Sequence, residues 1–227
     1  MNYEQMNNNM VELWGKIKTE PKYTHSVMDE KFYEFILEVP RLSDSSDLIP
    51  VTISEKLFGE YSLEVNSVIA ISGQFRSYNK LDNGKSKLML TVFVREMLEV
   101  DTTKNPNVIT LIGYVCKSPI YRTTPFKREI TDILVAVNRA YNKSDYIPAI
   151  AWGRNARFSK NLDIGSKVKI EGRIQSRVYQ KKISETEIEN KTAYEISITK
   201  INLEENNIEL ETDDVEQIAL KHYDQLN

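Results

Sequence analysis

The chain has 227 residues, enough for one large domain or two of about 100 residues each. No apolar run reaches the roughly 18 residues of a membrane-spanning helix, and the N-terminus lacks the pattern of a secretory signal. The single cysteine, Cys116, excludes a disulfide framework and makes a reducing cytoplasm the expected setting. His25 and His222 have no cysteine or histidine at ligand spacing, so we expect neither a metal nor another cofactor.

The net charge of −3 averages over segments of opposite sign. Residues 1–104 carry 12 Lys and Arg against 16 Asp and Glu, whereas residues 105–200 carry 17 against 9. Residues 201–227 carry 1 against 8. The basic middle segment between two acidic ones predicts a polyanionic partner for that segment.

The sequence contains two copies of one unit. Matching residues recur at an offset of 98: Leu13-Trp14-Gly15 as Leu111-Ile112-Gly113, Pro21 and Tyr23 as Pro119 and Tyr121, Val39 and Arg41 as Val137 and Arg139, and Ser46-Asp47-Leu48-Ile49-Pro50 as Ser144-Asp145-Tyr146-Ile147-Pro148. After one extra residue, Gly73 and Ser77 match Gly172 and Ser176. The polar stretch Glu99–Asn107 contains Pro106 and is the predicted linker.

The second unit predicts five strands and one helix in a fixed order. β-branched and apolar runs predict strands at Val108–Cys116, Ile130–Arg139 and Tyr146–Trp152, followed by a short helix within Gly153–Leu162 that stops before Gly165. Period-two alternation predicts further strands at Ser166–Arg177 and Thr192–Ile201, joined by a hairpin over Tyr179–Lys191. A helix between the third and fourth of five strands is the order of an OB-fold barrel.

The fold class is therefore mainly all-β, with two tandem five-stranded OB-fold barrels over residues 1–100 and 106–203. Glycines at matched places within strands, such as Gly113 and Gly172, fit barrel strands that bend sharply. The acidic segment 204–227 places Val215, Ile218 and Tyr223 at helical spacing, which predicts a short amphipathic C-terminal helix.

The second unit resembles the bacterial single-stranded DNA-binding (SSB) family along most of its length. The resemblance lies in Ile112-Gly113, Ser118–Thr123, Leu134–Arg139, Asp145–Gly153 and Ile164–Tyr179. It implies that bases stack on four aromatic side chains, namely Tyr141, Tyr146, Trp152 and Tyr179. Stacking suits any base, because every base has a π-face, and contributes about 1–3 kcal/mol per base. The candidate phosphate ligands are Arg122, Arg128, Arg139, Arg154, Arg173 and Arg177, and binding through them should weaken strongly with salt.

The first unit lacks these aromatic side chains. Ser43, Leu48, Ser54 and Lys80 stand at the corresponding positions. Its fourth strand replaces the charged face of the second unit by Val68, Ala70, Ser72 and Gln74, which suggests a face covered by another barrel or subunit. We therefore expect the first barrel to bind weakly or to serve in assembly.

The chain shows no Ser-His-Asp set, Gly-rich phosphate loop or acidic metal cluster, so we do not expect an enzyme. The main hypothesis is sequence-independent binding and protection of single-stranded DNA in replication, recombination or repair, in the bacterial cytoplasm and at the nucleoid. By resemblance, two barrels per chain imply a homodimer with four barrels, and replication or repair proteins are possible partners. The alternative is an OB-fold adaptor in a replication-restart or mobile-element complex. The chain lacks the Pro-Phe tip with which family members dock partner proteins, which favours this alternative.

Overall fold

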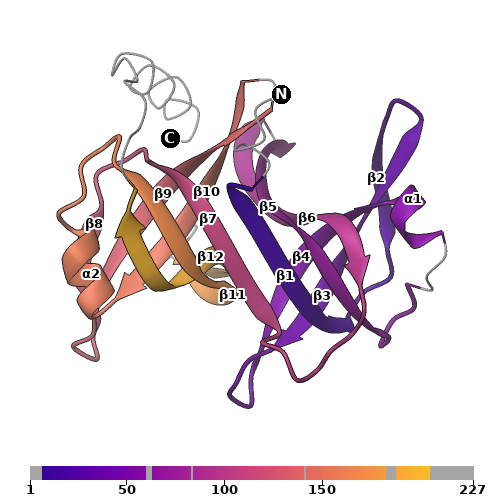
Figure 1. Cartoon of the computed structure of the whole chain (residues 1–227), viewed down its shortest axis with the longest axis horizontal. Coiled ribbons are helices and arrows are strands. Elements are labelled where there is room, and N and C mark those ends of the chain that lie inside the picture. Colours follow the sequence, from indigo (N-terminus) through magenta and orange to yellow (C-terminus); the bar gives the residue numbers. More distant parts are fainter. Residues whose placement is uncertain (1–6, 60–62, 83, 141, 183–187, 205–227) are drawn as a thin grey trace.

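A computed structural model of the chain describes residues 7–59, 63–82, 84–140, 142–182 and 188–204. Strands form two barrels that lie side by side (Figure 1). The first barrel contains β1 (Asn9–Ile17), β2 (Lys22–Val27), β3 (Glu30–Pro40), β4 (Ser46–Ser54), α1 (Glu55–Phe58), β5 (Val68–Asp82) and β6 (Lys85–Leu98). The second contains β7 (Asn107–Val115), β8 (Ile120–Thr123), β9 (Glu129–Arg139), β10 (Lys143–Trp152), α2 (Arg154–Ser159), β11 (Lys167–Lys182) and β12 (Ile188–Leu203).

The predicted fold class is confirmed, with one addition. Each barrel has five long strands and a short helix after the third of them, as the sequence indicates. In both units a short strand that the sequence did not reveal, β2 or β8, pairs with the edge of the following strand. The expected C-terminal helix falls in residues 205–227 and lies outside the described residues.

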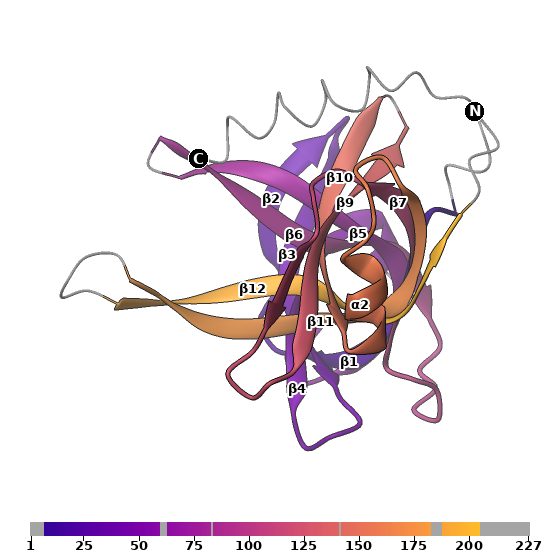
Figure 2. The same ribbon diagram turned by 90° about the vertical axis from the view of Figure 1, so that its left-hand side faces the viewer.

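Alternation along the strands fills the barrel interiors. Val168, Ile170 and Ile174 are fully buried on β11, and Ile196 and Ile198 face them from β12, as their period-two spacing predicts. The β11–β12 hairpin is longer than the predicted strands and extends well beyond the barrel (Figure 2). This extension lengthens the outer face of the second barrel.

Glycines allow each barrel to close. A Cβ on Gly113 would lie 2.5 Å from the carbonyl oxygen of Ala136 on β9. A Cβ on Gly172, where β11 has a bulge, would lie 2.4 Å from the carbonyl oxygen of Ser197. Real Cβ atoms do not approach a backbone oxygen so closely, so these strands can cross only where a side chain is missing.

The two barrels join through equivalent strands. β1 pairs antiparallel with β7, and Val11 lies opposite Ile109, its own counterpart in the repeat. The pairing makes one continuous sheet of the two barrels and relates them by a local two-fold axis. The linker, residues 99–106, runs beside this junction, where Trp14 donates a 3.0 Å hydrogen bond from Nε1 to the Lys104 carbonyl oxygen.

A buried aspartate from each barrel binds the other barrel. Asp47 of β4 accepts hydrogen bonds from the Ser176 backbone N–H and from Arg173 Nη1, both at 2.7 Å. Asp145 of β10 accepts a hydrogen bond of the same length from the Ser77 backbone N–H. Both carboxylates are fully buried. The repeated Ser-Asp and Ser positions of the sequence are therefore the reciprocal contacts of the barrel junction.

Candidate nucleic-acid interface

Strand register brings the aromatic side chains of β10 to the outside of the second barrel. Residues opposite one another on neighbouring strands share a face of the sheet. Trp152 lies opposite Ile130, and Ile130 lies opposite Arg122 on β8, so these three side chains share one face. Tyr146 has the same parity as Trp152 and lies opposite Ala136. The alternate residues of β9, such as Val135, fill the core.

The same outer face continues onto β12 and β11. Ser197 of β12 lies beside Ile150 of β10 and opposite Arg173 of β11. Further along β11, Arg177 and Tyr179 have the parity of Arg173. All the site residues expected on strands, except Arg139, are therefore brought to one continuous curved surface.

The aromatic rings on this face differ in how open they are. Trp152 and Tyr179 are each 37% exposed, whereas Tyr146 is half-buried and burial raises the pKa of its hydroxyl. Arg177 lies over the Tyr179 ring, with the guanidinium carbon 5.7 Å from the ring centroid. Tyr141, the fourth expected stacking residue, lies outside the described residues.

Four of the expected phosphate ligands already pair with carboxylates. Arg122 bonds Asp132 at 2.7 Å, and this hydrogen bond raises the pKa of the guanidinium. Arg177 lies 3.4 Å from Glu195. The other two pairs belong to the barrel junction and are Arg173 with Asp47 and Arg139 with Asp145.

Arg139 of β9 does not share the outer face on which Tyr146 of β10 lies. It has the parity of the core residues Val135 and Val137 on its own strand. In contrast, Arg128 and Arg154 are exposed and form no ion pair with a carboxylate of the described residues. They are the two expected arginines whose full charge is available to solvent.

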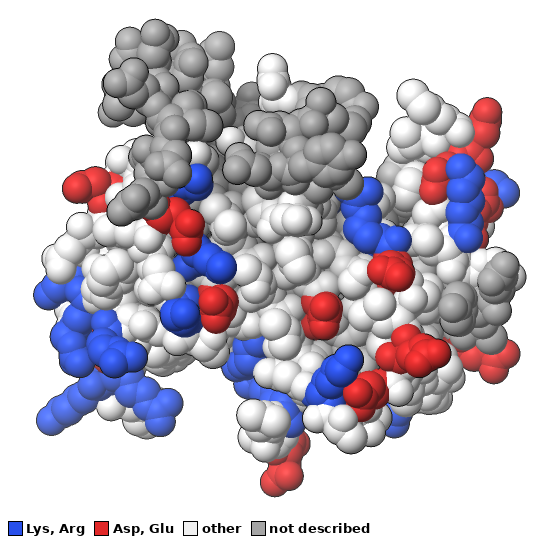
Figure 3. Space-filling model, in the orientation of Figure 1, with Lys and Arg blue, Asp and Glu red and all other residues white. Residues whose placement is uncertain are grey.

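The hairpin between β8 and β9 carries residues that the sequence reasoning missed. Phe126 is 87% exposed in the turn, next to Lys127 and Arg128. Lys160, at the end of α2, has its Nζ 5.1 Å from the centroid of the Tyr121 ring on β8. The sequence Pro125-Phe126-Lys127-Arg128 could have indicated this, because it places an aromatic residue beside two cations in a predicted loop. Figure 3 shows Lys and Arg gathered around α2 and the loop beneath it, at the lower left.

Three observations on the described residues concern metal sites, membrane spans and thiol chemistry. They contain no group of three or more His, Cys, Asp or Glu that could hold a metal ion. No helix within them is long and apolar enough to cross a membrane. Cys116 is buried, and burial raises the pKa of its thiol to about 11, which does not suit a nucleophile.

Solved structures establish the fold of the whole two-barrel chain. The single-stranded DNA-binding protein from Thermus aquaticus superposes with a TM-score of 0.69 at 14% identity, covering 91% of this chain and 97% of that one. At so low an identity the match concerns the fold alone. It covers both barrels, including the first, whose sequence has diverged.

Sequence comparisons match one part of the chain. The single-stranded DNA-binding protein of Clostridium tetani is 35% identical over 83 residues, which is 34% of this chain and 57% of the relative. Single-stranded DNA-binding protein 1 of Staphylococcus aureus is 35% identical over 81 residues, or 33% and 48%. The chain thus spans about half the length of these curated relatives, which are named as binding proteins and not as enzymes. The family model described as the single-strand binding protein family matches residues 106–204, so the second barrel belongs to that family, on a chain that adds another barrel of the same fold.

Proposed function

We propose that the chain binds and protects single-stranded DNA without sequence preference, in replication, recombination or repair, and that the second barrel carries the main site. The observation that supports this most is the shared outer face of Tyr146, Trp152 and Tyr179 within a barrel of the single-strand binding family. Tyr141 completes the proposed set of stacking residues. Each stacked base would contribute about 1–3 kcal/mol.

The proposed phosphate contacts differ in whether an existing ion pair must be broken to form them. Arg128 and Arg154 can meet a phosphate directly, because they are exposed and unpaired among the described residues. Arg122 and Arg177 would have to leave their carboxylate partner for the phosphate or contact both at once. The same holds for Arg139 and Arg173, whose carboxylate partners lie in the barrel junction. We therefore expect Arg128 and Arg154 to contribute most of the salt dependence.

Two further points belong to the proposal. A homodimer would bring four barrels together, and sedimentation of the full chain would test this by its mass. The expected site of action is the bacterial cytoplasm, at the nucleoid.

A titration tests the main proposal. Fluorescent oligo-dT is titrated with the wild-type chain and with the Trp152→Ala/Tyr179→Ala variant at two salt concentrations. The loss of two stacked bases should weaken binding by more than about 10-fold, since each is worth at least about 1 kcal/mol. Val178→Ala is the matched control, because Val178 neighbours Tyr179, is 68% exposed and has the opposite parity on β11. Absence of binding by the wild type at low salt would refute the proposal, and equal binding by the double variant would refute this site.

The adaptor function remains the second candidate, and the four arginines already paired with carboxylates favour it. A face whose cations are neutralised within the chain attracts a polyanion less than its count of arginines suggests. The same titration separates the two functions, because an adaptor predicts little or no binding of oligo-dT even at low salt.

A further inference from the structure

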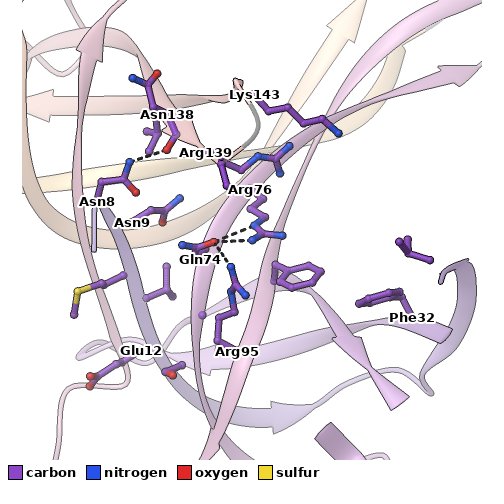
Figure 4. A pocket seen from close by; sticks show the side chains of 18 of the residues that line it. Asn8, Asn9, Glu12, Phe32, Gln74, Arg76, Arg95, Asn138, Arg139 and Lys143 are labelled. Atoms are coloured by element: carbon purple, nitrogen blue, oxygen red, sulfur yellow. Dashed lines mark hydrogen bonds between the residues drawn. The ribbon is translucent and has the colours of Figure 1, made fainter. Parts of the chain in front are cut away.

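A groove runs across the first barrel and reaches the second. It has a volume of about 1130 Å³ and is bounded by β5 and β6 on one side and by the β9–β10 hairpin on the other. Figure 4 shows Arg76 and Arg95 converging on Gln74, with Arg139 and Lys143 of the second barrel above them, and all four cations line the groove. None of these lies at the four positions where the family resemblance expects stacking.

Arg76 and Arg95, the two cations that the first barrel contributes to the groove, lack acidic partners among the described residues, whereas Arg139 pairs with Asp145. Gln74 Oε1 accepts hydrogen bonds from Arg76 Nη2 at 2.7 Å and from Arg95 Nη2 at 3.4 Å, which holds the two guanidinium groups together. Among the described residues, no carboxylate forms an ion pair with either of them. Burial, together with the charges of Arg95 and Arg139, lowers the pKa of Arg76 to about 10. An anion in the groove would relieve this repulsion.

A row of rings extends from these cations along the groove. The Arg76 guanidinium carbon lies 4.0 Å from the centroid of the Phe93 ring. Phe93 is followed by Phe32, with centroids 5.7 Å apart, and Phe32 is stacked on His25 at 5.0 Å with an interplanar angle of 10°. His25 is exposed at the end of the row. Rings beside unpaired cations form the combination that binds single-stranded nucleic acid, which presents bases and phosphates alternately.

The equivalent place in the second barrel carries a carboxylate instead of a cation. Arg76 lies opposite Thr91 in the first barrel, and the matching pair in the second is Gln175 opposite Glu195. There Gln175 Nε2 donates a 2.7 Å hydrogen bond to Glu195, which also pairs with Arg177. The first barrel thus has a cation opposite a neutral hydroxyl where the second has a neutral amide opposite an acid. This arrangement of charges is therefore not repeated at the matching positions of the second barrel.

We propose that this groove is a second binding site for single-stranded nucleic acid, with a phosphate against Arg76 and Arg95 and a base beside the Phe93–Phe32–His25 row. The proposal rests on the proposed function and extends it to the first barrel, which was expected from its lost aromatic positions to bind weakly. Arg139 and Lys143, which come from the second barrel, would let one strand pass from one barrel to the other.

The full chain tests the proposal through the length of strand that it covers. Poly-dT is titrated with the wild type, with Arg76→Gln/Arg95→Gln, and with Lys56→Gln/Lys104→Gln, a charge-matched control in which both lysines are exposed and outside the groove. We expect the groove variant, unlike the control, to cover fewer nucleotides per chain. The slope of log affinity against log salt should fall by about 0.7, the value for one lost phosphate contact on a single strand.

A cross-link gives a second readout that does not depend on charge. Oligonucleotides containing 5-iodouracil should cross-link to peptides that contain His25 or Phe93, and the groove variant should lose these products. If the Arg76 change lowers the melting temperature, Arg95→Gln with His25→Ala repeats the test at two exposed side chains.

The groove proposal would be overturned if the groove variant covered the same length of strand and had the same salt slope as the control, and if all cross-links lay in the second barrel. The proposed function would then still stand. A wild-type chain that binds no poly-dT at low salt would overturn both.

Discussion

Removing the carboxylate of Asp47 tests how much the junction stabilises the protein. Asp47 accepts hydrogen bonds from Arg41 Nε at 2.8 Å and Nη2 at 2.6 Å, besides those from Arg173 and the Ser176 N–H. Breaking a buried ion pair by removing one partner costs about 3–5 kcal/mol. The two arginine side chains are 29% and 32% exposed, so water can replace part of the loss, and we expect about 3 kcal/mol for Asp47→Ala.

For a chain of this size, a loss of about 3 kcal/mol corresponds to a fall in melting temperature of about 6–12 °C. Thermal unfolding followed by circular dichroism measures it, and Asp44→Ala, on the exposed loop before β4, is the matched control. A double-mutant cycle with Arg173→Gln, which removes the side-chain donor from the other barrel, should show a coupling of about 0.5–3 kcal/mol across the junction. Equal melting temperatures for Asp47→Ala and Asp44→Ala would refute the assignment of Asp47 as a stabilising contact between barrels.

Three further outcomes are expected. Gly172→Ala should lower the melting temperature markedly, because its Cβ would lie 2.4 Å from the Ser197 oxygen, whereas Gly59→Ala, at 3.7 Å from its nearest neighbour, should not; a similar change for both would contradict the account of barrel closure. Burial raises the pKa of Asp145 above its ordinary 3.8, so its contribution to stability is complete below about 3.8 and is lost as the pH rises through the folded pKa; urea titrations should show Asp145→Asn gaining stability relative to the wild type over that rise, and a constant difference would refute the shift. Cys116, with its pKa raised from 9 to about 11, should react with iodoacetamide at pH 8 roughly 100-fold more slowly than in the urea-unfolded chain, and equal rates would show that it is not buried.

The parts of the fold that were predictable are those with a local signal. Alternation at Val168 and Ile170 revealed a strand with one buried face, and the 98-residue offset revealed two copies of one barrel. The short strands β2 and β8 gave no such signal, since every residue of both is exposed and no period-two pattern of burial exists to read. Their position follows only from pairing with β3 and β9.

The common face of the candidate aromatic residues was predictable from the sequence, whereas the ion pairs of the candidate arginines were not. Trp152 and Tyr179 lie on strands whose register follows from the pattern, so their common face was within reach of the sequence. The partner of Arg173 stands 126 residues away in the other barrel, and no local pattern connects the two. The groove of the first barrel was not predictable either, because its lining residues are far apart in the sequence. Arg76 and Phe93 lie on different strands, and Arg139 lies in the other barrel.

Comparing the two copies separates assembly from binding. Asp47 and Asp145, like their serine partners, are the same in both copies because the local two-fold axis makes each of them a contact of the same junction. Positions on the outer faces escape this constraint, which is why Arg76 can stand where the other barrel has Gln175. Identity between the copies therefore marks residues whose loss should lower stability, and difference marks residues whose loss should change what each barrel binds.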